Sequence, residues 1–241
     1  MWHIASKTLY KNYMRYEYKH LLKSSKKNFF LSIYLLIKYY FFKIRNNKKI
    51  KINKTLQSNY RKIIKDQLKI KEDWFSVNIN TLDFFFTRIN FYNKKINMLE
   101  IGSYEGNSSV FFLKYFPNLN LTCVDTFEGS IEQKNKNFNQ VYENFKFNVN
   151  DYKVRLKVVK DTSDNFFKSS NVVFYDLIYI DGSHYYKDVL SDAKNSFKLL
   201  NKGGYLIFDD FLWGFYSDIN ENPIGAIKVF FKENFFNLKI V

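Results

Sequence analysis

Residues 97–110 read Asn-Met-Leu-Glu-Ile-Gly-Ser-Tyr-Glu-Gly-Asn-Ser-Ser-Val, and the rest of the chain can be placed around them. The apolar run Met98–Ile101 ends in a turn that carries Gly102 and Gly106, and a helical pattern follows, so we expect a strand, a turn and a helix. Glycines let such a turn approach a ligand closely, and the free N–H groups of the helix start face the same crevice. The turn suits a nucleotide-like ligand. A loop without a ligand is the alternative, because Tyr104 replaces the middle glycine of the full dinucleotide pattern.

Buried strands and helices alternate after residue 74. Continuous apolar strands separated by helices predict a doubly wound α/β domain with a mostly parallel, Rossmann-like sheet, which binds its ligand at the carboxyl ends of the strands. The expected strands are Met98–Ile101, Leu121–Val124, Leu156–Val159, Leu177–Ile180 and Tyr205–Phe208. The expected helices are Ser108–Tyr115, Asn139–Phe147, Thr162–Lys168, Tyr185–Leu200 and Ile224–Phe231, preceded by one that packs Leu82, Phe85, Phe86 and Ile89 on the sheet.

The length and composition predict one sizeable domain with an appendage. A chain of 241 residues with 46% hydrophobic residues can build a real core. We place a basic, aromatic-rich helical segment at residues 1–73 and the ligand-binding domain at residues 74–241. The single cysteine, Cys123, excludes an internal disulfide and is expected in the core. A reducing compartment fits, and no cleavable signal peptide is evident, so we expect a cytoplasmic protein.

The chain carries a net charge of +15, from 38 basic and 23 acidic residues. This charge indicates either an anionic partner or a genomic bias toward Lys, Asn, Ile, Phe and Tyr, and both explanations stay open. Residues 29–42 are the most apolar part, between basic flanks. Fourteen helical residues reach about 21 Å, short of the roughly 30 Å hydrocarbon core. They suit peripheral contact with the inner membrane face, or else packing on the domain or on a partner.

Acidic residues follow the first two strands. Asp125 comes 23 positions after Gly102, near the offset at which an acid hydrogen-bonds a ribose hydroxyl. Glu100 adds a second acid, which we expect to face the same ligand. A carboxylate at this point would repel a pyrophosphate and favours a ligand with a positive centre and no phosphate. The alternative for Glu100 is a residue that only caps the neighbouring turn.

Three more aspartates follow the fourth and fifth strands. Asp181, Asp209 and Asp210 would offer carboxylates to one crevice, where they repel one another unless a cation or a shared proton lies between them. Oxygen ligands suit Mg²⁺ or another hard divalent cation. His184 could remove a proton from a hydroxyl near neutral pH. The alternatives are a helix cap for Asp181, a solvated turn for the aspartate pair and a hydrogen bond at the helix start for His184.

Four blocks together resemble a known family. Residues 98–108, 121–129, 176–186 and 202–210 resemble the class I S-adenosylmethionine-dependent methyltransferases. Within that class they look most like the bacterial subgroup with macrolide-sugar and rhamnosyl O-methyltransferases, and more distantly like catechol O-methyltransferase. The resemblance covers about residues 74–231. It implies a sheet that ends in a further strand, of which only Leu238–Val241 could be the start, so we expect the chain to be truncated at its carboxyl end.

The resemblance also implies roles for individual residues. It implies that the cofactor S-adenosylmethionine is bound by Glu100, Gly102, Ser103, Gly106, Asp125, Thr126, Asp161 and Thr162. It implies that Mg²⁺ or a similar cation is held by Asp181, Asp209 and Asp210, with Asp181 and His184 as the catalytic residues. The third metal ligand of catechol-type enzymes is often Asn, so Asp210 departs from that pattern.

The expected function is therefore metal-assisted O-methylation of a small-molecule or glycan acceptor, such as a sugar or a secondary metabolite. Two other classes stay open, an NAD(P)-dependent oxidoreductase with the same crossover architecture and a non-catalytic membrane-associated binding protein. Nucleic acid is not expected as the partner, because only the charge favours it and no Asn-Pro-Pro-Tyr type motif follows the fourth strand. The sequence predicts neither the acceptor nor the oligomeric state.

Overall fold

The computed structural model describes residues 37, 54–130, 138–169, 173–211, 213–218, 221–234 and 237–238. The predicted membrane-contact segment 29–42 lies outside these residues, except for the exposed helical residue Ile37. The predicted final strand at 238–241 lies outside them as well, except for Leu238. Within the described ranges, no helix combines the length and the apolar character that crossing a bilayer requires.

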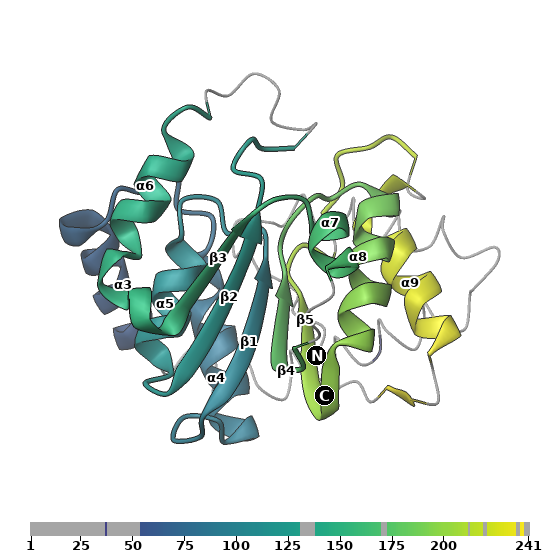
Figure 1. Ribbon diagram of the computed structural model, residues 1–241, viewed down its shortest axis with the longest axis horizontal. Coiled ribbons are helices and arrows are strands. Elements are labelled where there is room, and N and C mark those ends of the chain that lie inside the picture. The colour runs from purple at the N-terminus through teal and green to yellow at the C-terminus, as the bar shows by residue number, and fades with distance from the viewer. Residues whose placement is uncertain are drawn as a thin grey trace.

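Five strands form one sheet in the order β3-β2-β1-β4-β5, and all four pairings are parallel (Figure 1). The strands are β1 Ile96–Ile101, β2 Leu119–Asp125, β3 Leu156–Lys160, β4 Tyr175–Ile180 and β5 Leu200–Phe208. The sheet confirms the doubly wound α/β prediction. Because the strand order reverses between β1 and β4, a crevice opens at their carboxyl ends.

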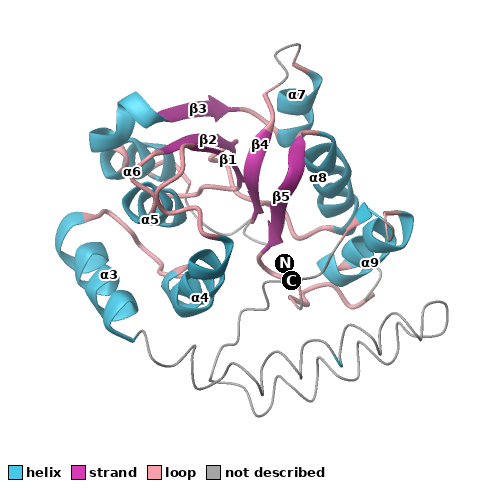
Figure 2. Cartoon of the chain, turned by 90° about the horizontal axis from the view of Figure 1, so that it is seen from below, coloured by secondary structure: helices cyan, strands magenta, loops and turns pink. Residues whose placement is uncertain are grey.

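Helices cover both faces of the sheet (Figures 1 and 2). The first group is α3 Lys54–Gln67, α4 Ile79–Ile89, α5 Asn107–Tyr115 and α6 Val141–Asn148. On the other side lie α7 Ser163–Lys168, α8 Tyr186–Lys198 and α9 Pro223–Glu233. Short 3-10 helices, η2 Ser76–Asn78 and η4 Asn150–Arg155, join them. The helices predicted after residue 74 are confirmed, with ends that differ by a few residues, whereas most of the predicted helical segment 1–73 lies outside the described residues.

The strands contribute side chains to two apolar cores, one on each face of the sheet, because successive side chains of a strand point to opposite faces. Met98 and Tyr179 pack with α4 and α5, whereas Leu99 and Ile178 pack with α8 and α9. Cys123 is fully buried in the first core, which confirms its predicted place. Burial raises the pKa of its thiol well above the usual range, so the thiol is inert at neutral pH.

The segment from residue 54 onward packs on the first core. Tyr60 is buried against Phe111, with ring centroids 5.2 Å apart, and its hydroxyl donates to the Asn107 carbonyl at 2.5 Å. The Lys71 amide donates to Glu105 Oε2 at 2.7 Å. Helix α3 therefore helps to hold the start of α5, which directly follows the glycine turn.

Replacing Tyr60 with alanine tests this packing. Removal of a buried aromatic ring leaves a cavity, so Tyr60→Ala should lower the free energy of unfolding by about 3–5 kcal/mol in urea titrations. Tyr92→Ala is the control, because the Tyr92 side chain is 54% exposed, and it should cost less than about 1 kcal/mol. Equal losses in the two variants would contradict a structural role of α3.

Candidate functional site

The turn between β1 and α5 is tied to the neighbouring strand β4. Gly102 has a φ of +84° and Gly106 a φ of +82°, in the left-handed region that glycine adopts freely. A Cβ atom on Gly102 would lie 2.1 Å from the Asp181 carbonyl oxygen. The sequence predicted a glycine that lets a ligand approach. The structure shows a further reason for Gly102, the close approach of two backbone segments, and its predicted contact with a ligand stays a prediction.

Tyr104 stands at the middle of this turn with a φ of 47°, which is uncommon for a residue with a side chain. Its ring lies 5.1 Å from the ring of Trp74, measured between centroids. Burial, helped by the nearby Glu105 carboxylate, raises the pKa of Tyr104 to about 12. The turn is thus bordered by aromatic rings that remain uncharged at neutral pH.

The carboxylate of Asp125 connects the end of β2 to the turn. Its Oδ2 atom accepts hydrogen bonds from the backbone N–H groups of Ser103 and Tyr104, both at 2.7 Å. Its Oδ1 atom accepts from the Phe127 amide, also at 2.7 Å. Thr126 follows, with its hydroxyl accepting from the Glu128 amide at 3.3 Å. Asp125 therefore holds two loops in place. It also lines a cavity at the carboxyl ends of the strands, which is described below.

Glu100 does not face this cavity. Its carboxyl group is fully buried and accepts hydrogen bonds from the hydroxyls of Ser103, at 3.0 Å, and Ser109, and from the Cys123 thiol at 3.1 Å. Burial raises the pKa of this carboxyl group. Because side chains alternate along β1, Glu100 points toward α5 and supports the glycine turn through Ser103 and Ser109. Its expected contact with a cofactor stays a prediction.

The end of β3 supplies the next two predicted residues. Asp161 is exposed and accepts hydrogen bonds from Asn165 Nδ2 at 2.8 Å and from the Thr162 amide at 2.7 Å, which lower its pKa. Thr162 caps α7, since its hydroxyl accepts from the Asn165 amide at 3.2 Å. Both residues line the cavity beside Asp125.

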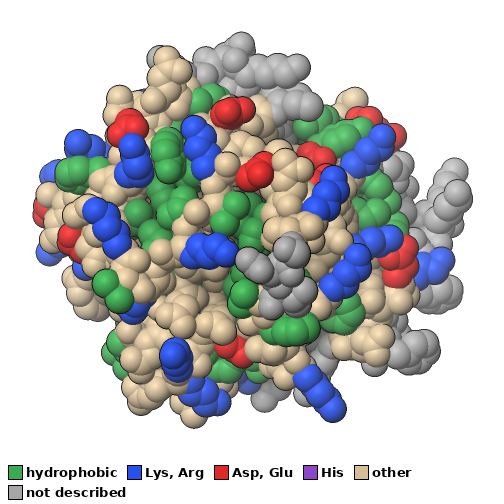
Figure 3. Space-filling view, in the orientation of Figure 1, with side chains coloured by type: hydrophobic (Ala, Val, Ile, Leu, Met, Phe, Trp, Pro, Cys, Tyr) green, Lys and Arg blue, Asp and Glu red, His purple; other side chains and the backbone are tan. Residues whose placement is uncertain are grey.

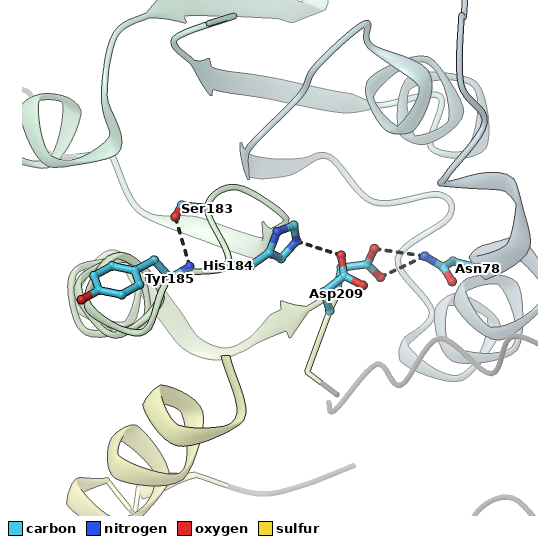
Figure 4. Close-up of polar contacts among 6 residues, drawn as sticks. Asn78, Ser183, His184, Tyr185 and Asp209 are labelled. Atoms are coloured by element: carbon cyan, nitrogen blue, oxygen red, sulfur yellow. Dashed lines mark hydrogen bonds and ion pairs between the residues drawn. The ribbon is translucent and has the colours of Figure 1, made fainter. Parts of the chain in front are cut away.

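Three possible ligands for a metal ion meet at the ends of β4 and β5. Asp181, His184 and Asp210 each offer a ligand atom within 4.8 Å of the others. His184 Nε2 lies 2.9 Å from Asp210 Oδ2, and Figure 4 shows the imidazole reaching the end of β5 from one side. Asp209 was predicted in this set but is directed to the opposite side. Its two oxygens accept from Asn78 Nδ2 at 2.9 and 3.1 Å.

The carboxyl groups at the ends of β4 and β5 lie in surroundings that disfavour their ionised form. Burial and the neighbouring carboxylates of Asp209 and Asp210 raise the pKa of Asp181 well above its usual range. Burial, with Asp210 close by, raises the pKa of Asp209 to about 8. Two carboxylates and an imidazole would be relieved by a cation placed between them, so these residues fit a divalent metal ion.

Asp192 is a further buried acid, which the sequence analysis did not identify. It lies on α8, is 2% exposed and borders the cavity, and burial raises its pKa to about 7. The sequence did hold a signal, because Asp192 falls on the buried stripe of Val189, Ala193 and Ser196 at helical spacing.

One cavity of about 730 Å³ collects most of these side chains, a size typical of small-molecule sites. Of the predicted site residues, its wall includes Gly102, Ser103, Asp125, Thr126, Asp161, Thr162, Asp181, His184, Asp209 and Asp210. The predicted residues Glu100 and Gly106 are not part of the wall that the described residues form. The glycine turn and the potential metal ligands thus open into the same space.

Residues 99–211 match the model of a family described as a methyltransferase domain. The matched segment runs from β1 through β5 and contains the turn, Asp125 and the three potential metal ligands. This segment of the chain is therefore similar to a methyltransferase domain. The parallel sheet with its crevice agrees with that similarity.

Similar proteins include an uncharacterized protein of Acanthamoeba polyphaga mimivirus, 29% identical over 126 residues, which cover 48% of this chain and 52% of that protein. The chain therefore spans about half the length of this curated relative. The O-methyltransferase TomG from Streptomyces achromogenes, solved in complex with S-adenosylmethionine, is 12% identical with a TM-score of 0.48, covering 76% of this chain and 78% of TomG. A candidate caffeoyl-CoA O-methyltransferase from Staphylococcus aureus is 19% identical with a TM-score of 0.47, covering 85% and 90%. Likeness of this degree says nothing about the substrate.

The close approach at Gly102 can be tested against a matched glycine. Gly102→Ala places a methyl group against the Asp181 carbonyl, whereas Gly203, with a φ of +82°, has nothing within 4 Å of an added Cβ. Both variants carry left-handed strain of about 1–2 kcal/mol, and only Gly102→Ala adds a backbone clash. We expect Gly102→Ala to lower the melting temperature clearly more than Gly203→Ala. Equal losses would show that the turn is not tied to β4.

Asp192 predicts a pH dependence of stability. Because its pKa is raised in the folded state, folding favours the protonated acid, and this stabilisation is lost as the pH rises from about 4 through 7. Asp192→Asn should match the wild type near pH 4 and become the more stable protein above pH 7, as measured by thermal unfolding in a pH series. A difference between the two proteins that stays constant across this range would refute the burial of an ionisable carboxyl group here.

Proposed function

We propose that this protein transfers the methyl group of S-adenosylmethionine to a hydroxyl oxygen of a small acceptor, such as a sugar, a glycan or a secondary metabolite. The observation that carries the proposal is the shared cavity. The glycine turn with Asp125 forms one part of its wall, and Asp181, His184 and Asp210 form the adjoining part. A cofactor at the turn would thus meet an acceptor at the strand ends.

The turn side of the cavity suits the adenosyl part of the cofactor. The Asp125 carboxylate uses three acceptor positions for backbone N–H groups, and an ionised carboxylate offers about four. Its remaining capacity is available to a ribose hydroxyl. Asp161 and Thr162 lie beyond it at the end of β3, where the adenine would follow.

The other side of the cavity suits the acceptor hydroxyl. In the proposed reaction the methyl carbon leaves the sulfonium sulfur and bonds to the acceptor oxygen, and the hydroxyl proton passes to Nδ1 of His184, the ring nitrogen that does not contact Asp210. Asp210 orients the imidazole through the 2.9 Å contact, and Trp213 stacks on its face at 4.3 Å. Alignment of the two reactants is the largest contribution, on the order of 7–11 kcal/mol at its limit.

Asp181, His184 and Asp210 are also the residues that would hold a divalent cation. When bound, such a cation would supply Lewis-acid chemistry that lowers the pKa of an acceptor hydroxyl. The imidazole changes the expectation for the metal, since Mg²⁺ prefers oxygen ligands whereas Mn²⁺ and similar ions accept imidazole as well.

Calorimetric titration with S-adenosylhomocysteine tests the cofactor assignment. The wild type should bind it, and Asp125→Asn should weaken binding at least tenfold, because the variant loses the charge and one acceptor oxygen. Asp151→Asn, at an exposed residue of η4, is the matched control and should leave the affinity unchanged. Binding of NAD⁺ in place of S-adenosylhomocysteine would overturn the proposal in favour of an oxidoreductase.

The proposed separation of a cofactor subsite at the turn from a metal subsite at the strand ends gives a second prediction. Asp181→Asn should leave the affinity for S-adenosylhomocysteine within about threefold, while it removes the binding of Mn²⁺ measured in a separate titration. A loss of both affinities in Asp181→Asn would contradict separate cofactor and metal subsites. Retained Mn²⁺ binding would remove the proposed metal site.

A further inference from the structure

The cavity wall has acidic side chains and, among the described residues, no Lys or Arg. Ten acidic residues line it, namely Glu72, Glu105, Asp125, Asp161, Asp164, Asp181, Asp188, Asp192, Asp209 and Asp210. Among the described residues no lysine or arginine lines it, although the whole chain has 38. Lys and Arg side chains are instead scattered over the face of the molecule that Figure 3 shows. Such a cavity disfavours an anionic ligand and attracts a cation.

Three rings, those of His184, Trp213 and Phe215, stack on one another next to the acidic ends of β4 and β5. The Trp213 indole stacks on His184, with centroids 4.3 Å apart and planes at 22°. Phe215 stacks on Trp213, with centroids 5.5 Å apart and planes at 20°, and its side chain is 59% exposed. Both Trp213 and Phe215 line the cavity. We call these two residues the aromatic wall. Trp213 stacks between two rings, and the exposed Phe215 ring beside it is suited to a ring-shaped molecule or to a cation.

The loop that carries the aromatic wall is fixed by one buried side chain. Asn222, which is 2% exposed, accepts hydrogen bonds through Oδ1 from the Phe215 and Tyr216 amides at 3.0 and 3.1 Å. Its Nδ2 atom donates to the carbonyls of Tyr216 and Asp218, both at 2.9 Å. Four hydrogen bonds from one residue hold the loop in place before any ligand arrives, which reduces the ordering cost of binding.

We propose that the acceptor is a ring-shaped hydroxyl compound without negative charge, favoured further by a cationic group, and that its ring stacks on the aromatic wall. This inference rests on the proposed function, because it assigns the acceptor side of the same cavity. The ring contacts Trp213 and Phe215, its hydroxyl reaches His184, and a cationic group is attracted by the surrounding carboxylates. An acceptor that carries a phosphate or a carboxylate is repelled by the same wall.

Three phenols that share the hydroxyphenyl ring and differ in the group at the other end, and hence in charge, test the proposal. Tyramine is cationic, 4-hydroxyphenylethanol is neutral and 4-hydroxyphenylacetate is anionic. Each is titrated calorimetrically into the full chain saturated with S-adenosylhomocysteine. We expect tyramine to bind at least tenfold more tightly than 4-hydroxyphenylacetate, with the neutral phenol between them and a smaller difference at high salt. Equal affinities, the reverse order, or no binding of any of the three at millimolar concentration would overturn the proposal.

Variants of the aromatic wall test the contribution of ring stacking to acceptor binding separately from the contribution of charge. Phe215→Leu and Asn222→Ala should each weaken tyramine binding at least fivefold while the affinity for S-adenosylhomocysteine stays within twofold. Phe174→Leu is the matched control, since Phe174 is 51% exposed and outside the cavity wall, and it should change neither affinity. Unchanged tyramine binding in Phe215→Leu would exclude the wall. Failure of the wild type to bind S-adenosylhomocysteine would instead count against the proposed function itself.

Discussion

The backbone contact between the glycine turn and the end of β4 determines how the site is built. Gly102 leaves no room for a side chain, because an added Cβ would lie 2.1 Å from the Asp181 carbonyl oxygen. The Gly102 amide donates to the Val124 carbonyl at 3.0 Å, and the Asp181 amide donates to the Ile101 carbonyl at 2.8 Å. Three strand ends are thus joined at one point. The turn, Asp125 and Asp181 consequently open into one cavity.

This arrangement concentrates carboxyl groups at the switch point of the sheet. Buried carboxyl groups are costly, and the raised pKa values of Asp181, Asp192 and Asp209 record that cost. A sulfonium cofactor, a metal ion or a cationic acceptor would each relieve it. Any of these groups that is ionised opposes a pyrophosphate, which is the physical ground for preferring S-adenosylmethionine to a dinucleotide as the ligand.

The strands could be predicted from the sequence because most of their residues are apolar and a polar residue follows, as in Leu177–Ile180 before Asp181. The directions of the side chains at the strand ends could not be predicted from the sequence. Extended backbone sends consecutive side chains to opposite sides, so Asp209 faces Asn78 while Asp210 faces His184. Which of the two joins Asp181 depends on packing between distant elements. The burial of Glu100 under the turn likewise depends on Ser109, which α5 supplies.

The most direct test of this account is a crystal structure of the protein with S-adenosylhomocysteine. We expect the ribose hydroxyls to lie within hydrogen-bond distance of the Asp125 carboxylate and the sulfur to point toward the space between Asp181 and His184. A ligand bound elsewhere, or a cavity whose turn and strand ends lie on separate surfaces, would contradict the account.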